Sequence, residues 1–211
     1  MGVSGLQSRN HCLNRCREEN ESLRANSGTL KWRNVDVGAG HYYITATFRD
    51  WLPLFNRAET REVVCEEITK AMRELGGSVT AFVLMPTHLH LLVYLPGTGL
   101  LHRFCMLWRG RSARRISGLL ESQGEHAILR AITTSRGSRQ HYSVWKEQVR
   151  SLPIVTDGKL QQIADYIHAN PVRRGLADSP MDWEFPSFRS GGIGGRRQAP
   201  ALRTAILADG Q

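Results

Sequence analysis

The sequence is short of cysteine and of long apolar runs, and each shortage excludes a class of protein. Only 4 cysteines occur among 211 residues, too few for the disulfide framework that stabilises small secreted domains. We therefore expect free thiols. No apolar run reaches the roughly 20 residues of a membrane-spanning helix, and the polar first residues lack the apolar centre of a signal peptide. We expect a cytoplasmic protein without a membrane partner.

Acidic residues are also scarce relative to basic ones. The chain carries 28 lysines and arginines against 19 aspartates and glutamates, which gives a formal net charge of +9. This excess favours a polyanionic partner over a neutral metabolite, and nucleic acid is the leading candidate. Because proteins with other partners are also basic, the assignment depends on the motifs.

The distribution of polar and apolar residues divides the chain into three parts. A polar N-terminal extension covers residues 1–37, a main domain covers 38–190, and a tail with glycine and arginine covers 191–211, where we expect flexibility. One hydrophobic core is the default at this length. His11, Cys12 and Cys16 in the extension resemble part of a zinc site, but no second ligand pair follows at the usual separation.

Two periodicities alternate within the main domain. A period of two, with a proline-containing break at Pro86-Thr87, predicts strands over 41–48, 79–85, 88–95 and 142–150. Helical spacing, with stops at Gly76 and Pro171, predicts helices over 64–75, 101–119 and 158–170. Residues 122–141 are polar and predicted to be irregular. The fold class is therefore α+β, an antiparallel sheet with helices packed on it.

His88 and His90 open the second strand of the predicted hairpin, with Leu89 between them. Residues two apart on a strand project to the same face, so both imidazoles can reach one metal ion while Leu89 points into the core. Neutral imidazole nitrogens bind divalent cations. Two polar residues on a solvent-facing strand would show the same pattern, so the pair alone does not establish a metal site.

Tyr166 and Asn170 lie four residues apart in the predicted third helix and therefore share one face. Ile163, Ala164 and Ile167 mark the buried side of that helix. A helical tyrosine is more often a packing residue than a nucleophile, and an asparagine before a proline is usually a helix terminator. The function of both residues depends on what lies near them.

Together the two motifs resemble the REP-associated tyrosine transposases, a branch of the HUH nuclease superfamily related to single-domain insertion-sequence transposases. The resemblance runs roughly from Tyr42 to Phe188. Its strongest parts are the hairpin from Phe82 to Val93 and the block from Tyr166 to Leu176, which reads Tyr-Ile-His-Ala-Asn-Pro-Val-Arg-Arg-Gly-Leu. Trp145 and the Asp182-Trp183 segment also fit.

The resemblance implies a fold, a cofactor and a reaction. The fold is the ferredoxin-like, RRM-like HUH endonuclease fold. A divalent cation, Mg²⁺ or Mn²⁺, is held by His88, His90 and Asn170, and Tyr166 is the nucleophile. The implied reaction nicks and rejoins single-stranded DNA through a 5′-phosphotyrosyl intermediate, near hairpins of repetitive extragenic palindromes (REP). Such an enzyme is expected to be a monomer or a homodimer.

Basic residues near both motifs are candidates for contacts with DNA phosphates. They are Arg109, Arg111, Arg114, Arg115, Arg173 and Arg174. Trp108 lies in the same helix as the first four and could stack on a base, but its helical phase favours the core. An arginine-rich helix face that is only solvated gives the same sequence pattern.

Three other functions compete with this interpretation. Another HUH nickase, such as a relaxase or a replication initiator, shares the histidine pair and the tyrosine but normally carries further domains. A non-catalytic, basic nucleic-acid-binding protein could retain the HUH fold, and a metal-dependent covalent adduct separates it from the enzyme. A zinc hydrolase is disfavoured because no glutamate or further histidine lies near His88 at the spacing of zinc proteases.

Overall fold

The structure is a computed structural model that describes residues 35–136 and 139–183. Residues 1–34 lie outside the described part. They make up most of the predicted N-terminal extension and include Cys12 and Cys16. The predicted tail over 191–211 also lies outside the described part. What the structure describes is therefore most of the predicted main domain.

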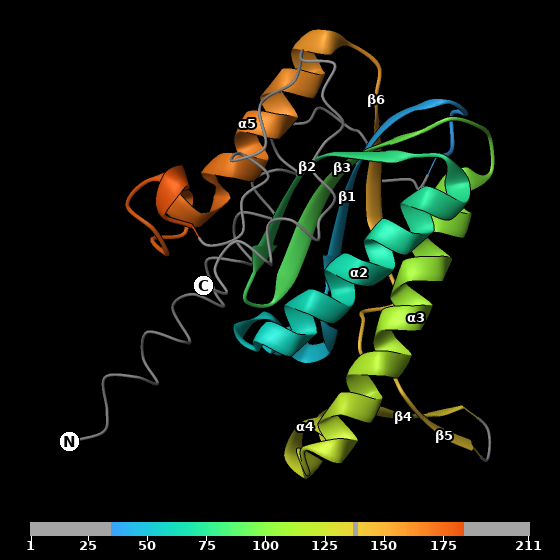
Figure 1. The fold of residues 1–211 in the computed structure, drawn as a ribbon, viewed down its shortest axis with the longest axis vertical. Coiled ribbons are helices and arrows are strands. Elements are labelled where there is room, and N and C mark those ends of the chain that lie inside the picture. The colour runs from blue at the N-terminus through green and yellow to red at the C-terminus, as the bar shows by residue number, and fades with distance from the viewer. Residues whose placement is uncertain (1–34, 137–138, 184–211) are drawn as a thin grey trace. The chain divides into compact units, whose positions relative to one another are not determined.

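A four-stranded antiparallel sheet forms the centre of this domain (Figure 1). Its strands, in the spatial order β2-β3-β1-β6, are β1 (Gly40–Thr47), β2 (Ser78–Met85), β3 (His88–Leu95) and β6 (Arg150–Ile154). The helix α2 (Ala58–Leu75) connects β1 to β2, and α3 (Leu100–Ser122) follows β3. Because β3 lies between β1 and β2, this is the split βαβ arrangement of ferredoxin-like folds. The predicted α+β class is confirmed.

Helices cover both faces of the sheet. α2 and α3 pack against each other on one face, and α5 (Asp157–Arg173) lies on the other, over β2 and β3 (Figure 1). The shorter elements are η1 (Arg49–Trp51), η2 (Leu54–Asn56), α4 (His126–Ile132), β4 (Thr133–Arg136), β5 (Arg139–Tyr142) and η3 (Pro180–Asp182). Among the described helices, none combines the length and the apolar character that crossing a membrane requires.

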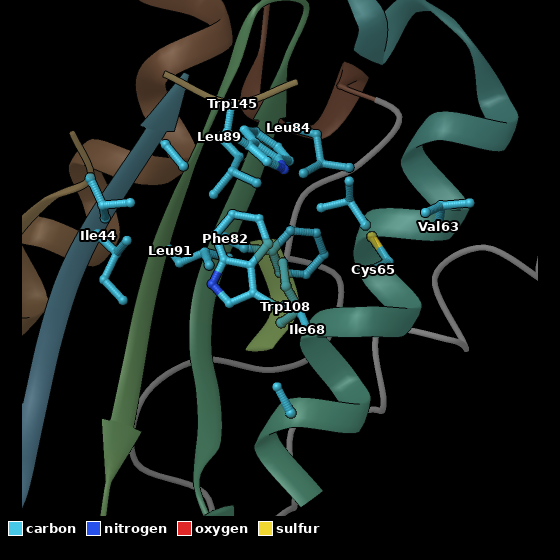
Figure 2. Close-up of a cluster of buried hydrophobic side chains, with 14 of the residues drawn as sticks. Ile44, Val63, Cys65, Ile68, Phe82, Leu84, Leu89, Leu91, Trp108 and Trp145 are labelled. Atoms are coloured by element: carbon cyan, nitrogen blue, oxygen red, sulfur yellow. The ribbon is translucent and has the colours of Figure 1, made fainter. Parts of the chain in front are cut away.

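The main core lies between the sheet and the layer formed by α2 and α3 (Figure 2). Strand alternation sends Ile44, Leu89 and Leu91 toward these helices, where all three are fully buried. Trp108 of α3 is also fully buried and meets the Trp145 ring edge-on, with 5.1 Å between centroids. The helical phase therefore predicts the role of Trp108 correctly, and its ring is not available to stack on a base.

The prediction that residues 122–141 are irregular is wrong, because they contain α4 and the hairpin of β4 and β5. Leu129 and Ile132 anchor α4 in the core. A helix of 7 residues is too short to produce a recognisable helical period, and β4 and β5 have 4 residues each. All three elements are shorter than the windows over which a sequence pattern becomes visible.

The last strand of the sheet begins at Arg150, later than the predicted range 142–150. The cause is Trp145, whose ring stacks on Phe48 at 4.3 Å between centroids and whose Nε1 donates to Ser112 Oγ at 3.1 Å. Because the indole is buried in the core, the chain around Trp145 does not follow the direction of a strand. Regular pairing with β1 starts only where Arg150 lies opposite Thr45.

The third predicted helix continues past Pro171, which lies inside the last turn of α5. There the missing N–H of the proline removes only one helical hydrogen bond. The helix is closed instead by Gly175, which has φ 64 and donates its N–H to the carbonyl oxygen of Val172 at 2.9 Å. As a result, Arg173 is helical and Arg174 is the C-cap residue.

Candidate metal and nucleophile site

The two histidines lie on the face of the sheet that α5 covers. His88 pairs with Thr47 of β1 and His90 pairs with Thr45, so these four side chains project from the same face. Both imidazoles are 5% exposed, and their ring centroids are 4.9 Å apart. Leu89 is buried in the core on the opposite face. The alternation predicted for the histidine pair is confirmed.

His90 is held by hydroxyl groups at one ring nitrogen, while no described residue contacts the other by a hydrogen bond. Its Nδ1 lies 2.7 Å from the Tyr43 hydroxyl and 3.0 Å from Thr45 Oγ1. Its Nε2 is buried without a hydrogen-bond partner in the described part of the chain. A buried nitrogen in this state costs free energy unless a ligand contacts it. In the tautomer with the proton on Nδ1, Nε2 carries the lone pair that a metal ion requires.

His88 is oriented in the same way. Its Nδ1 lies 3.0 Å from Oγ1 of Thr87, which belongs to the two-residue turn between β2 and β3. A contact at Nδ1 leaves Nε2 as the nitrogen that can bind a cation. In both rings a hydroxyl group at Nδ1 thus holds the direction of the imidazole, with Nε2 left to face a ligand.

Burial keeps both histidines neutral. It lowers the pKa of His88 to about 3, and the nearby charge of Arg174 contributes to the same shift. Burial, the neighbouring His88 and the charge of Arg174 hold the pKa of His90 well below its ordinary value. Because neutral imidazole is the form that binds cations, both rings have the ligating form at neutral pH.

Helix α5 brings Tyr166 to this histidine pair. The half-buried Tyr166 ring lies edge-on to the His90 ring, with 5.9 Å between centroids. It also lies edge-on to Tyr43 at 6.3 Å, and the guanidinium carbon of Arg173 is 5.3 Å from the Tyr166 centroid. The candidate nucleophile on α5 and a candidate metal ligand on β3 are thus in contact where the helix packs on the sheet.

Asn170 and Arg174 continue the face of α5 that begins with Tyr166, because the three residues are spaced by four. Asn170 is 2% exposed, and its Nδ2 donates to the carbonyl oxygen of Tyr166 at 2.9 Å. A backbone carbonyl only accepts, so the amide nitrogen is used there and Oδ1 is the atom that can serve as a ligand. The charge of Arg174 acts on both histidines, so the end of this face lies near them.

The donor set fits a divalent cation with mixed nitrogen and oxygen ligands. Within residues 35–136 and 139–183, no three His, Cys, Asp or Glu side chains form a group that could hold a metal ion. His88 and His90 therefore need a third ligand of another type, and Asn170 offers an amide oxygen. These three ligands are uncharged, so a bound divalent cation would keep its full charge for an anionic substrate.

Two of the predicted DNA-contacting arginines, Arg173 and Arg174, lie at the end of α5 beside the candidate site. The other four belong to α3, which packs on the opposite face of the sheet (Figure 1). Contacts of the α3 arginines with DNA stay a prediction. The structure does not bring these two groups of arginines together around one site.

Acidic side chains of α2 engage two of the α3 arginines. Arg111 donates to both carboxylate oxygens of Glu74, and Arg115 donates to Glu67 Oε1 at 2.8 Å. Arg109 is half-buried and donates to the main-chain oxygen of Lys146. These three guanidinium groups thus have hydrogen-bond partners within the protein, although Arg115, like Arg114, is exposed.

Sequence reasoning missed the hydroxyl groups that orient the histidines. The period of two in the sequence does place Tyr43 and Thr45 on the face of the first strand that points away from the main core. The pairing of Thr45 with His90, however, depends on the register between β1 and β3. Without that register, no pattern distinguishes these hydroxyls from others on the strand.

We expect Tyr43→Phe to weaken Mn²⁺ binding about 10- to 100-fold, because it removes a hydroxyl at His90 Nδ1. Isothermal titration calorimetry of the purified protein with Mn²⁺ would measure the change. Tyr42→Phe is the matched control, since the Tyr42 hydroxyl is buried elsewhere and donates to Gly38 O at 2.6 Å. Equal Mn²⁺ affinities of Tyr43→Phe and the wild type would contradict the orienting role.

Comparison of the sequence with protein families and with curated proteins finds no match. Solved structures do match. One is a REP-associated tyrosine transposase bound to a REP hairpin, with a TM-score of 0.52 and 19% identity over 81% of this chain and 95% of that chain. Another is a candidate transposase from Deinococcus radiodurans R1, with a TM-score of 0.42 and 20% identity over 65% of this chain and 94% of that chain. The first likeness shows that this chain has the fold of a REP-associated tyrosine transposase, as the sequence motifs predict.

Proposed function

We propose that this protein is a metal-dependent endonuclease and strand transferase that nicks and rejoins single-stranded DNA through Tyr166. The observation that carries the proposal is the contact of Tyr166 with His90, whose Nε2 is buried without a partner among the described residues. The fold shared with a REP-associated tyrosine transposase supports the same function. The formal net charge of +9 suits a polyanionic substrate.

His88, His90 and the Oδ1 atom of Asn170 would hold Mg²⁺ or Mn²⁺ in this site. When bound, the cation would withdraw electron density from a non-bridging oxygen of the scissile phosphate. The protein would favour this binding through the protonation state and the orientation of its ligands. Burial keeps both imidazoles neutral, and the hydrogen bond from Nδ2 to the carbonyl of Tyr166 fixes the direction of the Asn170 amide.

Tyr166 would act as the nucleophile. Its hydroxyl oxygen bonds to phosphorus while the bond from phosphorus to the 3′-oxygen breaks. The tyrosine proton passes to solvent, and the departing 3′-oxygen takes a proton from water. The products are a 5′-phosphotyrosyl linkage and a free 3′-hydroxyl. Because the phosphotyrosine ester retains the bond energy, attack by a 3′-hydroxyl can rejoin the strand without a nucleotide cofactor.

Arg173 and Arg174 would bind the phosphate charge beside the reacting atoms. Arg173 lies against the Tyr166 ring, and the charge of Arg174 reaches both histidines. Guanidinium groups bind phosphates through parallel N–H donors, which also fixes the orientation of the phosphate. We propose a folded single strand as the DNA partner, in line with the REP hairpin bound by the structural neighbour.

A non-catalytic nucleic-acid-binding protein with the same fold is the main alternative. That function gives no reason to bury two neutral histidines beside a tyrosine, since a buried nitrogen without a partner lowers stability. The unpartnered Nε2 of His90 among the described residues therefore favours the enzyme.

A covalent adduct is the expected result when the full chain is incubated with a single-stranded hairpin oligonucleotide and Mn²⁺. Denaturing electrophoresis would detect the protein–DNA band, and mass spectrometry of its peptides would locate the linked nucleotide on Tyr166. Chelation of the metal by EDTA should remove the band. Binding of the hairpin without any adduct in the presence of Mn²⁺ would support the non-catalytic alternative instead.

A further inference from the structure

Trp51 and Lys146 lie together beside the histidine pair, and the proposed reaction uses neither. The ammonium nitrogen of Lys146 is 3.9 Å from the centroid of the Trp51 ring. The same ring is edge-on to His88, with 6.4 Å between centroids. Both side chains are half-buried and keep part of their surface open to solvent. An aromatic ring paired with a cation thus borders a candidate metal ligand.

The main chain holds Trp51 in an unfavourable conformation. Trp51 has φ 57 and Asp50 has φ 50, and within residues 35–136 and 139–183 they are the two non-glycine residues with positive φ. Asp tolerates the left-handed region, but a bulky residue such as tryptophan rarely adopts it. Strain of this kind persists where the surrounding structure enforces it, and it is concentrated at functional sites.

The loop that carries Trp51 is fastened to the turn that precedes His88. Phe48 N donates to Thr87 O at 3.0 Å at the start of the loop, and Phe55 N donates to Pro86 O at 3.1 Å at its end. Both ends of the loop are therefore tied to the same two-residue turn. The position of the indole relative to the histidine pair follows from these bonds.

Lys146 reaches the same place from the segment that precedes β6. Its main-chain N–H donates to Thr47 O at 2.9 Å, and Thr47 is the residue paired with His88. Its carbonyl oxygen accepts a hydrogen bond from the guanidinium of Arg109. Two backbone contacts thus position the lysine, and its ammonium group lies over the indole.

We propose that Trp51 and Lys146 form a nucleotide-binding subsite for single-stranded DNA beside the metal ligands. A nucleobase stacks on the indole face turned away from Lys146, and the ammonium group contacts an adjoining phosphate. Stacking on an aromatic side chain accepts any base, because every base has a π-face. The inference rests on the proposed function, since it assigns a nucleotide next to the scissile phosphate to this pair.

The test removes the nucleobase from the DNA and the indole from the protein. It measures whether the affinity lost without the base depends on the presence of the indole. The probes are a fluorescein-labelled oligothymidine of about 12 nucleotides and an abasic oligomer with the same backbone. Fluorescence anisotropy with the full chain in EDTA gives both affinities. We expect Trp51→Gly to reduce the wild-type preference for oligothymidine about tenfold, the effect of stacking one base. Trp51→Phe, which keeps a ring, should retain most of the preference.

Substitution of the lysine has a different expected signature. Lys146→Ala should weaken the binding of both oligonucleotides equally. It should also reduce the slope of log affinity against log salt concentration by about 0.7, as expected for one lost phosphate contact. Two controls should change neither quantity. Tyr94→Ala removes an exposed ring from β3, and Lys159→Ala removes an exposed charge from α5.

An unchanged base preference in a folded Trp51→Gly protein would overturn the subsite. Glycine adopts positive φ without strain, so this variant should fold, and Trp51→Asn, which also tolerates the conformation, provides a second measurement. The outcome is independent of cleavage. If the base preference depends on Trp51 but no adduct forms, the proposed nicking fails and the subsite stands. If the adduct forms and the preference for oligothymidine does not depend on Trp51, only the proposed subsite is wrong.

Discussion

Replacing Tyr166 with phenylalanine is expected to abolish cleavage of a hairpin oligonucleotide, a loss of about 10⁴-fold or more in rate. The change removes only the hydroxyl group that would attack phosphorus. The remaining ring can keep its edge contacts with His90 and Tyr43, so the fold and the affinity for the hairpin should be preserved. Single-turnover cleavage with Mn²⁺ measures the rate, and anisotropy measures the affinity.

Tyr94→Phe is the matched control for this experiment. It removes an exposed hydroxyl from the strand that carries the histidines, and its cleavage rate should equal that of the wild type. If Tyr166→Phe cleaved at the wild-type rate, Tyr166 would have no part in the chemistry and the covalent mechanism would be wrong.

Replacing His90 with alanine is expected to eliminate stabilisation by Mn²⁺. A cation that binds only the folded state stabilises it by about 2.7 kcal/mol at about 100 times its dissociation constant. For a protein of this size we therefore expect Mn²⁺ to raise the wild-type Tm by about 5 to 10 °C. The variant lacks the buried Nε2, and its Tm should not respond. Differential scanning fluorimetry with and without Mn²⁺ measures both shifts.

Leu92→Ala controls for the cavity that the His90 substitution leaves. Leu92 is fully buried on the same face of β3, two residues beyond His90. Its truncation should cost about 2–5 kcal/mol of stability and lower the Tm of the metal-free protein. The rise caused by Mn²⁺ should nevertheless persist, because both histidines remain. An equal Mn²⁺ response in His90→Ala would mean that the cation binds elsewhere.

Local patterns predict the fold well where they extend over a whole element. The alternation around Ile44 and around Leu89 identifies which side chains join the main core, and the hairpin break at Pro86-Thr87 lies where the structure has it. Predictions fail where one contact overrides the pattern. Trp145 leaves the path of a strand to reach Ser112, and no local pattern records that partner.

The candidate site was only partly predictable. His88 and His90 share a face because of strand geometry, and Tyr166 and Asn170 share a face because of helical geometry. Trp51 was not identified, since nothing in its neighbourhood signals a left-handed backbone at a tryptophan. That conformation results from hydrogen bonds between the loop and a turn more than thirty residues away in sequence, such as Phe48 N to Thr87 O.

The amino-acid sequence by itself determined the periodicities, and with them the two pairs of side chains that carry the proposed chemistry. Only the tertiary structure decided that the helix and the strand that carry these pairs lie against each other. α5 lies over β2 and β3 and brings Tyr166 to His90, while β1 supplies the hydroxyl of Tyr43 to the same ring. The physical reason is that local geometry fixes the direction of a side chain within its own element, whereas packing and strand register fix which elements become neighbours.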